Sequence, residues 1–240
     1  LESIGYHHVA VKKKPKISVL STGNELIASG MVPRIGEVID SNRPAINAWL
    51  NKYQIELVKS EQCPDEYDQL KTKLLELAES SDLIITTGGT SVGTKDYLPD
   101  IIQDVGELWV HGCAIRPGKP IAIGTIKSQN SNTPIIALPG YPLAAFINFE
   151  LFAESLISKW TKMQPPWKEK TTVKLKSKIP SKAGMRDFVR LRDGSKGVEV
   201  IRITGAGILS SLVTADYMLE IPEDIEGYAE GTEVIVRKLR

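Results

Sequence analysis

Hydrophobic and polar positions follow two different patterns along the chain. In residues 15–164, short continuous apolar runs alternate with segments whose apolar positions recur every three or four residues. The first kind of run predicts buried strands and the second predicts amphipathic helices, so this part is typical of an α/β fold. In residues 165–240 the apolar runs are short and are separated by Gly and Pro, which predicts a small all-β domain.

The expected elements of both parts follow from these patterns. In the first part we expect strands at residues 17–20, 55–58, 82–87, 121–126 and 134–138, with the last two forming a hairpin. We expect helices at residues 44–53, 64–80, 97–105 and 143–162. In the second part we expect strands at residues 172–175, 187–191, 197–203 and 233–236.

The expected domain boundary lies at Pro165-Pro166, where the pattern of apolar runs changes from one typical of an α/β fold to one typical of a small all-β domain. An α/β domain of residues 15–164 and a β domain of residues 165–240 follow from that boundary. Residues 1–14 read as a linker that leaves another domain upstream, because the chain starts at Leu1 without an initiator Met. We therefore expect a fragment or a processed product.

Composition and charge exclude several classes of protein. Hydrophobic residues make up 42% of the chain and charged residues 25%, as in an ordinary globular protein. A net charge of +1 argues against a nucleic-acid coat or a membrane-surface protein. No apolar run reaches the roughly 18 residues that a membrane span needs, and no signal peptide is visible. The two cysteines form no CxxC pair, which fits a reducing cytoplasm.

The densest chemical signal is the stretch 86–96, which leaves a predicted strand and precedes a predicted helix. Two adjacent glycines allow several backbone N–H groups to converge, and hydroxyl side chains surround them. Such a loop at the carboxyl end of a strand suits a phosphate or another oxyanion, although a tight turn without a ligand has the same pattern. The candidate binding residues are Thr87, Gly88, Gly89, Thr90, Ser91 and Gly93.

Two named motifs almost fit this loop. A Walker A loop requires Lys directly after its second glycine, but Thr94 follows Gly93 and Lys95 comes one position late. Residues 89–93 also match G-x-S-x-G, the nucleophile elbow of serine hydrolases. That elbow needs a His after its acid, and His111 is the only histidine beyond the loop. The sequence therefore favours neither a P-loop nor a serine hydrolase.

Two carboxylates, Asp40 and Asp96, stand at the ends of predicted elements near this loop. Each can be a simple helix N-cap, which is the commoner role of a lone Asp at such a position. Two Asp at one edge of a sheet can instead hold a hard cation through oxygen ligands. The spacing alone leaves both interpretations open.

Two further motifs offer binding groups on stiff backbone. Residues 115–120 hold two prolines and a glycine, which present Arg116 and Lys119 as fixed cations for an anion or as a solvated turn. Residues 138–142 open the long predicted helix, whose free N–H groups can meet an anion. The candidate residues of this second motif are Pro139, Gly140 and Tyr141.

Taken in order, these motifs resemble those of the MoeA/gephyrin family of molybdenum-cofactor biosynthesis proteins. The likeness runs over nearly the whole chain. It rests on residues 21–26 (STGNEL), 39–43 (IDSNR), 86–93 (TTGGTSVG), 96–97 (DY), 116–120 (RPGKP) and 138–142 (LPGYP), with weaker likeness at 184–190 and 204–211.

The resemblance implies a fold and an activity. The fold is a three-layer, MogA-like molybdopterin-binding α/β domain with a mostly parallel sheet, followed by a small all-β barrel-like domain. The activity is the Mg²⁺-dependent insertion of molybdate into adenylylated molybdopterin, with release of AMP. The alternative is a module that binds molybdopterin as a scaffold without turnover.

The resemblance also implies residue roles and partners. Asp40 and Asp96 match the active-site aspartates, which we expect to act through Mg²⁺. The loop 87–93, Arg116 and Lys119 match the pterin-phosphate and anion-binding elements, and Arg186 and Ser210 match groups of the second domain. The resemblance further implies a homodimer in the full-length protein, a MogA-type adenylyltransferase as a possible partner, and a place in the cytoplasm.

Overall fold

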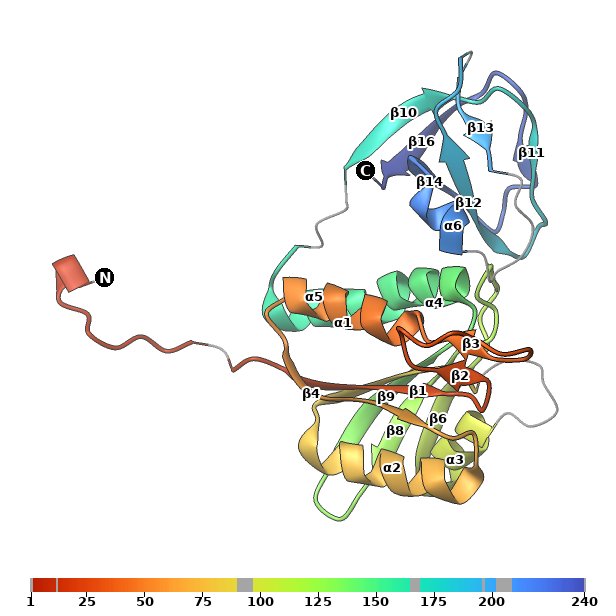
Figure 1. Cartoon of the computed structure of the whole chain (residues 1–240). Helices are drawn as coiled ribbons and strands as arrows, with labels where there is room; N and C mark the ends of the chain where they lie inside the picture. The colour runs from red at the N-terminus through yellow and green to blue at the C-terminus, as the bar shows by residue number, and fades with distance from the viewer. Residues whose placement is uncertain are drawn as a thin grey trace.

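The structure, a computed structural model, describes residues 2–11, 13–89, 97–164, 169–195, 197–201 and 209–239. Figure 1 shows a layered α/β unit and a smaller unit built mainly of strands. The N-terminal segment begins with a single helical turn, η1 (Glu2–Ile4), and runs out away from both units.

The main sheet places three strand ends side by side. Its strand order is β4-β1-β5-β9-β8-β6, in which β4, β1, β5, β9 and β6 run in one direction and β8, between β9 and β6, is antiparallel to both of its neighbours. Because β1, β5 and β9 are parallel neighbours, the loops that follow them meet at one edge. The strands are β1 (Lys16–Thr22), β4 (Glu56–Cys63), β5 (Leu83–Thr87), β6 (Gly106–His111), β8 (Ala122–Lys127) and β9 (Asn132–Leu138).

Helices cover both faces of this sheet (Figure 1). One face packs against α1 (Asn42–Lys52), α4 (Pro142–Asn148), the π-helical segment η2 (Phe149–Glu154) and α5 (Ser155–Thr161). The other face packs against α2 (Tyr67–Ser80) and α3 (Tyr97–Val105). Strand β5 shows the reason, because Leu83 and Ile85 enter the first cluster of buried side chains while Ile84 enters the second. The sheet is thus the middle of three layers.

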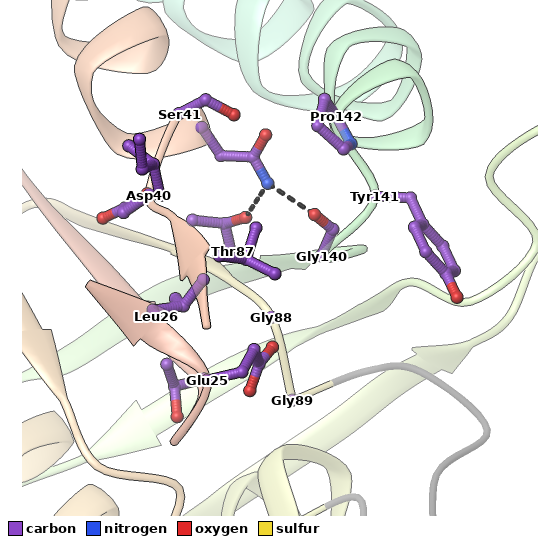
Figure 2. A pocket seen from close by; sticks show the side chains of 14 residues that line it. Glu25, Leu26, Asp40, Ser41, Thr87, Gly88, Gly89, Gly140, Tyr141 and Pro142 are labelled. Atoms are coloured by element: carbon purple, nitrogen blue, oxygen red, sulfur yellow. Dashed lines mark hydrogen bonds between the residues drawn. The ribbon is translucent and has the colours of Figure 1, made fainter. Parts of the chain in front are cut away.

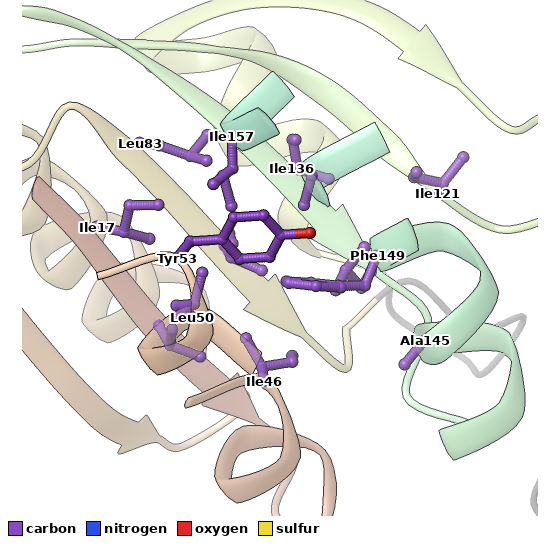
Figure 3. Close-up of a cluster of buried hydrophobic side chains, with 14 residues drawn as sticks. Ile17, Ile46, Leu50, Tyr53, Leu83, Ile121, Ile136, Ala145, Phe149 and Ile157 are labelled. Atoms are coloured by element: carbon purple, nitrogen blue, oxygen red, sulfur yellow. The ribbon is translucent and has the colours of Figure 1, made fainter. Parts of the chain in front are cut away.

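A polar pair lies inside the first of these clusters. Figure 3 shows Tyr53 among apolar side chains such as Leu50 and Phe149. The Tyr53 hydroxyl donates a hydrogen bond of 2.6 Å to Oε1 of Glu154, and both residues are buried. Burial, followed by the hydrogen bond to Glu154, raises the pKa of Tyr53 well above its usual range. The phenol therefore stays protonated and serves as a permanent donor to the carboxylate.

The second unit is an antiparallel β structure with its own apolar cluster. Its sheet has the order β10-β16-β14-β12-β13, and a separate pair joins β11 to β15. A short helix, α6 (Leu209–Val213), lies between this unit and α4. The strands are β10 (Lys170–Lys174), β11 (Ile179–Pro180), β12 (Arg186–Arg192), β13 (Glu199–Val200), β14 (Tyr217–Ile221), β15 (Gly227–Tyr228) and β16 (Glu233–Lys238).

The two units are joined by more than the covalent chain. Strand β7 (Ile115–Arg116) of the first unit pairs in parallel with β12 of the second. Arg237 binds Glu150 through two hydrogen bonds of 2.5 and 2.7 Å. An apolar cluster spans the contact and consists of Ile115, Leu143, Phe146, Ile147, Phe188 and Met218.

The expected fold class is confirmed, but the elements differ in detail, and in the second unit β14 was not among the expected strands. Strand β6 was not predicted, because an edge strand is defined by its pairing with β8 rather than by a long apolar run. The helix expected at 143–162 is interrupted by the π-helical turns of η2. A small parallel pair, β2 (Leu26–Ile27) with β3 (Val38–Ile39), extends from the main sheet. Among the helices of the described ranges, none is both long and apolar enough to cross a bilayer.

Candidate active site

A cavity of about 420 Å³ opens where β1, β5 and β9 end. The segments that line it are far apart in the sequence and meet because the parallel strands end at one edge of the sheet. The small β2–β3 pair and the start of α1 close its other side. The lining residues are Thr22, Glu25, Leu26, Val38, Ile39, Asp40, Ser41, Asn42, Thr87, Gly88, Gly89, Gly140, Tyr141 and Pro142.

The glycines after β5 are required by their surroundings. Gly88 has φ +93° and Gly89 has φ +63°, conformations that L side chains rarely adopt. A Cβ on Gly88 would lie 2.0 Å from the backbone oxygen of Thr22. Gly140 also approaches closely, since a Cβ there would lie 3.4 Å from Cα of Gly88. The three loops are therefore packed backbone against backbone, which leaves the cavity floor open to a ligand.

Asn42 connects two of these loops across the cavity (Figure 2). Its Nδ2 donates to Oγ1 of Thr87 at 2.8 Å and to the backbone oxygen of Gly140 at 2.7 Å. The side-chain amide of Asn42 thus donates both of its N–H bonds, and these two hydrogen bonds fix the separation between the loops after β5 and β9. Tyr141, with 54% of its surface exposed, lies at the rim of the same cavity.

Asp40 is the most buried carboxylate of the cavity, with 3% of its surface exposed. Its Oδ2 accepts hydrogen bonds from Ser21 Oγ at 2.7 Å and from Arg43 Nε at 2.8 Å. Its Oδ1 accepts the backbone N–H of Arg43, in the first turn of α1, at 3.2 Å. Arg43 also donates to the backbone oxygen of Ser60 on β4 at 3.3 Å. Asp40 therefore fixes the start of α1 to the sheet, although the N-cap residue of α1 is its neighbour Ser41.

The entrance beside the glycine turn is acidic. Glu25 lines the cavity, and Asp65 lies close by, accepting a hydrogen bond of 3.3 Å from Thr22. Burial raises the pKa of Asp65, and the charge of Glu25 raises it further, against the opposing hydrogen bond from Thr22. In the part of the chain that the structure describes, no group of three or more Asp, Glu, His or Cys side chains is placed to hold a metal ion.

The two cations of residues 115–120 lie outside this cavity. Arg116 forms a two-pronged ion pair with the buried carboxylate of Asp187 on β12, with its Nε 2.7 Å from Oδ1 and its Nη2 bound to Oδ2. Ser181 Oγ donates to the same carboxylate at 2.6 Å. Lys119 is exposed on the same loop. The expectation that both cations share one anion site with the glycine turn stays a prediction.

The remaining candidate residues fall in two groups. Arg186 lies at the start of β12 and pairs with Glu223 at 3.0 Å and with Glu220 at 3.2 Å, away from the cavity. Ser210 is exposed on α6 and does not line the cavity either. Four predicted residues lie outside the described part of the chain, namely Thr90, Ser91, Gly93 and Asp96.

The sequence analysis did not single out Asn42, Ser41 or Glu25 as site residues. Asn42 stands two residues before the start of the predicted helix, where an amide is usually assigned to capping. The signal that could have found it is its place after Asp40 on a loop at the same edge of the sheet as the glycine turn.

Comparison with known proteins matches each of the two units to a family of domains. Residues 18–159 match the family described as "Probable molybdopterin binding domain", and residues 172–239 match the MoeA C-terminal region (domain IV). A protein of Methanocaldococcus jannaschii, named for molybdopterin biosynthesis, is 33% identical over 253 aligned residues that cover 100% of this chain. The molybdopterin molybdenumtransferase of Haemophilus influenzae is 28% identical over 98% of this chain.

A solved structure supports the same assignment. The MoeA molybdopterin biosynthesis protein of Pyrococcus horikoshii superimposes with a TM-score of 0.78 at 29% identity, over 99% of this chain and 57% of its own. The chain spans 59% of the length of each of the two curated relatives above. On the match of both domain models and of the fold over its whole length, the chain belongs to the MoeA family.

Proposed function

We propose that this chain carries the molybdopterin-binding core of an enzyme that inserts molybdate into adenylylated molybdopterin and releases AMP. The observation that supports it best is the cavity where β1, β5 and β9 end, closed by backbone-packed glycines in a chain of the MoeA family. Relatives named molybdopterin molybdenumtransferase supply the substrate class.

Each group at the cavity has a role in this proposal. The turn at Gly88 and Gly89 packs against Thr22 without a Cβ between them and so fixes the part of the cavity that a phosphate would approach. Asn42 keeps the loops after β5 and β9 at the separation that the ligand needs. Tyr141 offers a flat ring at the rim for a pterin or an adenine to stack on. Lys119, which does not line the cavity, is proposed as a further point charge for an oxyanion.

The proposal includes Mg²⁺, but it restricts which carboxylate is the ligand. Mg²⁺ prefers oxygen ligands in octahedral geometry, yet both oxygens of Asp40 are engaged by Ser21 and Arg43. Oδ2 already accepts two hydrogen bonds and Oδ1 accepts one, so only Oδ1 keeps a lone pair for a cation, and no step is assigned to a metal there. We propose Asp96 as the carboxylate that holds the metal and Asp40 as the group that positions α1.

The proposed setting is a cytoplasmic homodimer that receives its substrate from a MogA-type adenylyltransferase. An exposed apolar segment beside the cavity supports association with another protein surface. Within it Val32 has 88% of its surface exposed, Met31 61% and Val38 54%. Apolar side chains gathered in this way are typical of protein contacts.

The test separates the enzyme from the scaffold alternative. Calorimetry with molybdopterin should show weaker binding for Asn42→Ala, because the two loops lose their connection. Asn51→Ala, at an exposed position of the same helix, is the matched control and should bind normally. In a longer version that carries the segments found in the relatives, Asp96→Asn should bind molybdopterin but release no AMP. AMP release at the wild-type rate in that variant would contradict the proposed role of Asp96, and no release by the wild type itself would favour the scaffold.

A further inference from the structure

A second groove lies at the opposite end of the main sheet from the candidate site. Its volume is about 720 Å³, and it is lined by Pro15 before β1, Asp82 before β5, the start of β9, and the end of α5. The candidate site lies where the same strands end. The five residues of β5, at about 3.3 Å each, separate the two by roughly 17 Å. The groove is therefore not an extension of the candidate site.

The groove carries uncompensated positive charge. Its lining includes one carboxylate, Asp82, whose Oδ2 accepts the backbone N–H of Lys16 at 2.7 Å. The lining lysines are exposed and pair with no carboxylate of the described residues, unlike Lys59, Lys71 and Lys73 elsewhere on the surface. These groove lysines are Lys13, Lys14, Lys159 and Lys162.

A structural role explains only part of this charge. Lys159 and Lys162 lie at the carboxyl end of α5, where cations stabilise the partial negative charge of a helix terminus. Lys13 and Lys14 belong to the N-terminal segment and have no helix to stabilise. Their convergence with the α5 lysines on one concave surface is what a dianionic ligand requires.

The wall between these lysines is partly apolar. Trp160 is half-buried and packs against the first core cluster, which holds its ring in place, while Pro15 and Pro134 also line the groove. Asn132 at the start of β9 adds a side-chain donor and acceptor. An aromatic ring flanked by cations is the arrangement that binds a nucleobase together with its phosphate.

We propose that this groove binds a nucleotide, with the phosphate on the lysines and the base against Trp160. Inorganic phosphate would use the lysines alone and leave the apolar wall uncovered. The volume lies within the range of about 300–1,000 Å³ that small-molecule sites occupy. This site does not depend on the activity proposed above, because no residue of the candidate cavity takes part in it.

The test follows AMP binding at the groove itself. In an ¹⁵N-labelled sample, titration with AMP should shift the Trp160 indole N–H signal, which Trp160→Phe identifies. The double variant Lys159→Ala/Lys162→Ala should weaken this binding at least about tenfold, a loss of about 1.4 kcal/mol. Lys178→Ala/Lys182→Ala, at exposed lysines of the second unit, should leave the affinity unchanged. Inorganic phosphate should bind more weakly than AMP.

Three results would overturn the proposal. The first is an unmoved Trp160 signal while only residues such as Gly88 and Gly140 respond, which would place AMP in the candidate site alone. The second is unchanged affinity in the α5 lysine variant, and the third is phosphate binding as tight as that of AMP. Asn42→Ala should leave binding at the groove intact, so failure of the proposed function is distinguished from failure of this site.

Discussion

The ion pair between Arg116 and Asp187 should respond differently to the loss of each partner. Asp187 has a side chain only 4% exposed, whereas that of Arg116 is 54% exposed. Removing Arg116 leaves a carboxylate that is buried and, among the residues that the structure describes, keeps only Ser181 as a side-chain donor. Removing Asp187 leaves a guanidinium that water can reach. The energetic cost of each change therefore depends on which charge stays behind.

The magnitudes follow from that asymmetry. Breaking a buried pair so that its charge is uncompensated costs about 3–5 kcal/mol, and Ser181 brings the expected cost of Arg116→Ala to the lower end, about 3 kcal/mol. An exposed pair contributes up to about 1 kcal/mol, and with the lost hydrogen bonds Asp187→Ala should cost about 1–2 kcal/mol. The double variant should be more stable than Arg116→Ala by about 1–2 kcal/mol, because no unpaired buried charge remains.

Urea-induced unfolding followed by circular dichroism measures these differences, with Arg192→Ala, at an exposed arginine of the second unit, as a control. Equal stability of Arg116→Ala and wild type would refute the reasoning and would leave Arg116 available for an anion. A double variant less stable than both single variants would also contradict it, because it would mean that the two side chains act independently.

Three further predictions concern the core, the cavity and a thiol. Tyr53→Phe should lower the free energy of unfolding by about 1–3 kcal/mol in thermal melts, because the buried Glu154 carboxylate loses its donor; a stability equal to wild type would contradict this. Gly88→Ala should yield a less stable chain with weakened molybdopterin binding, since its Cβ would overlap backbone, and normal binding would refute the close approach. Burial raises the pKa of the Cys63 thiol, so at pH 8 it should react with a disulfide reagent far more slowly than in urea; equal rates would show that the thiol is accessible.

Much of the α/β unit could be predicted because its signals are local. The helix expected at 97–105 forms within the bounds predicted for it, and strands 121–126 and 134–138 form the expected hairpin. Thr87 and Gly140, each expected at the end of a strand, both line the cavity because β5 and β9 are parallel neighbours that end together. These inferences need only the period of the side chains and the direction of the strands.

The rest depends on partners that are distant in sequence. The residues around Arg116 predict an exposed cation. In the structure its guanidinium forms an ion pair with Asp187, which lies 71 residues further along the chain. Asn42 donates a hydrogen bond to Gly140, which is 98 residues away, and the residues next to Asn42 in the sequence do not predict that contact. The π-helical segment η2 likewise places Glu150 toward Arg237 and Glu154 toward Tyr53. Such roles emerge only when the elements are packed.

The joint between the two units has a consequence for how the molecule can be divided. The second unit contacts the first through a strand pairing, an ion pair and the apolar cluster around Phe146 and Phe188. None of these contacts is made by the segment of chain that connects the two units. Separately expressed segments that end before residue 165 and begin after residue 168 should therefore reassemble without a peptide bond between them. The two fragments could therefore be used for split-protein complementation, in which the pairing of β7 with β12 forms part of the contact between them.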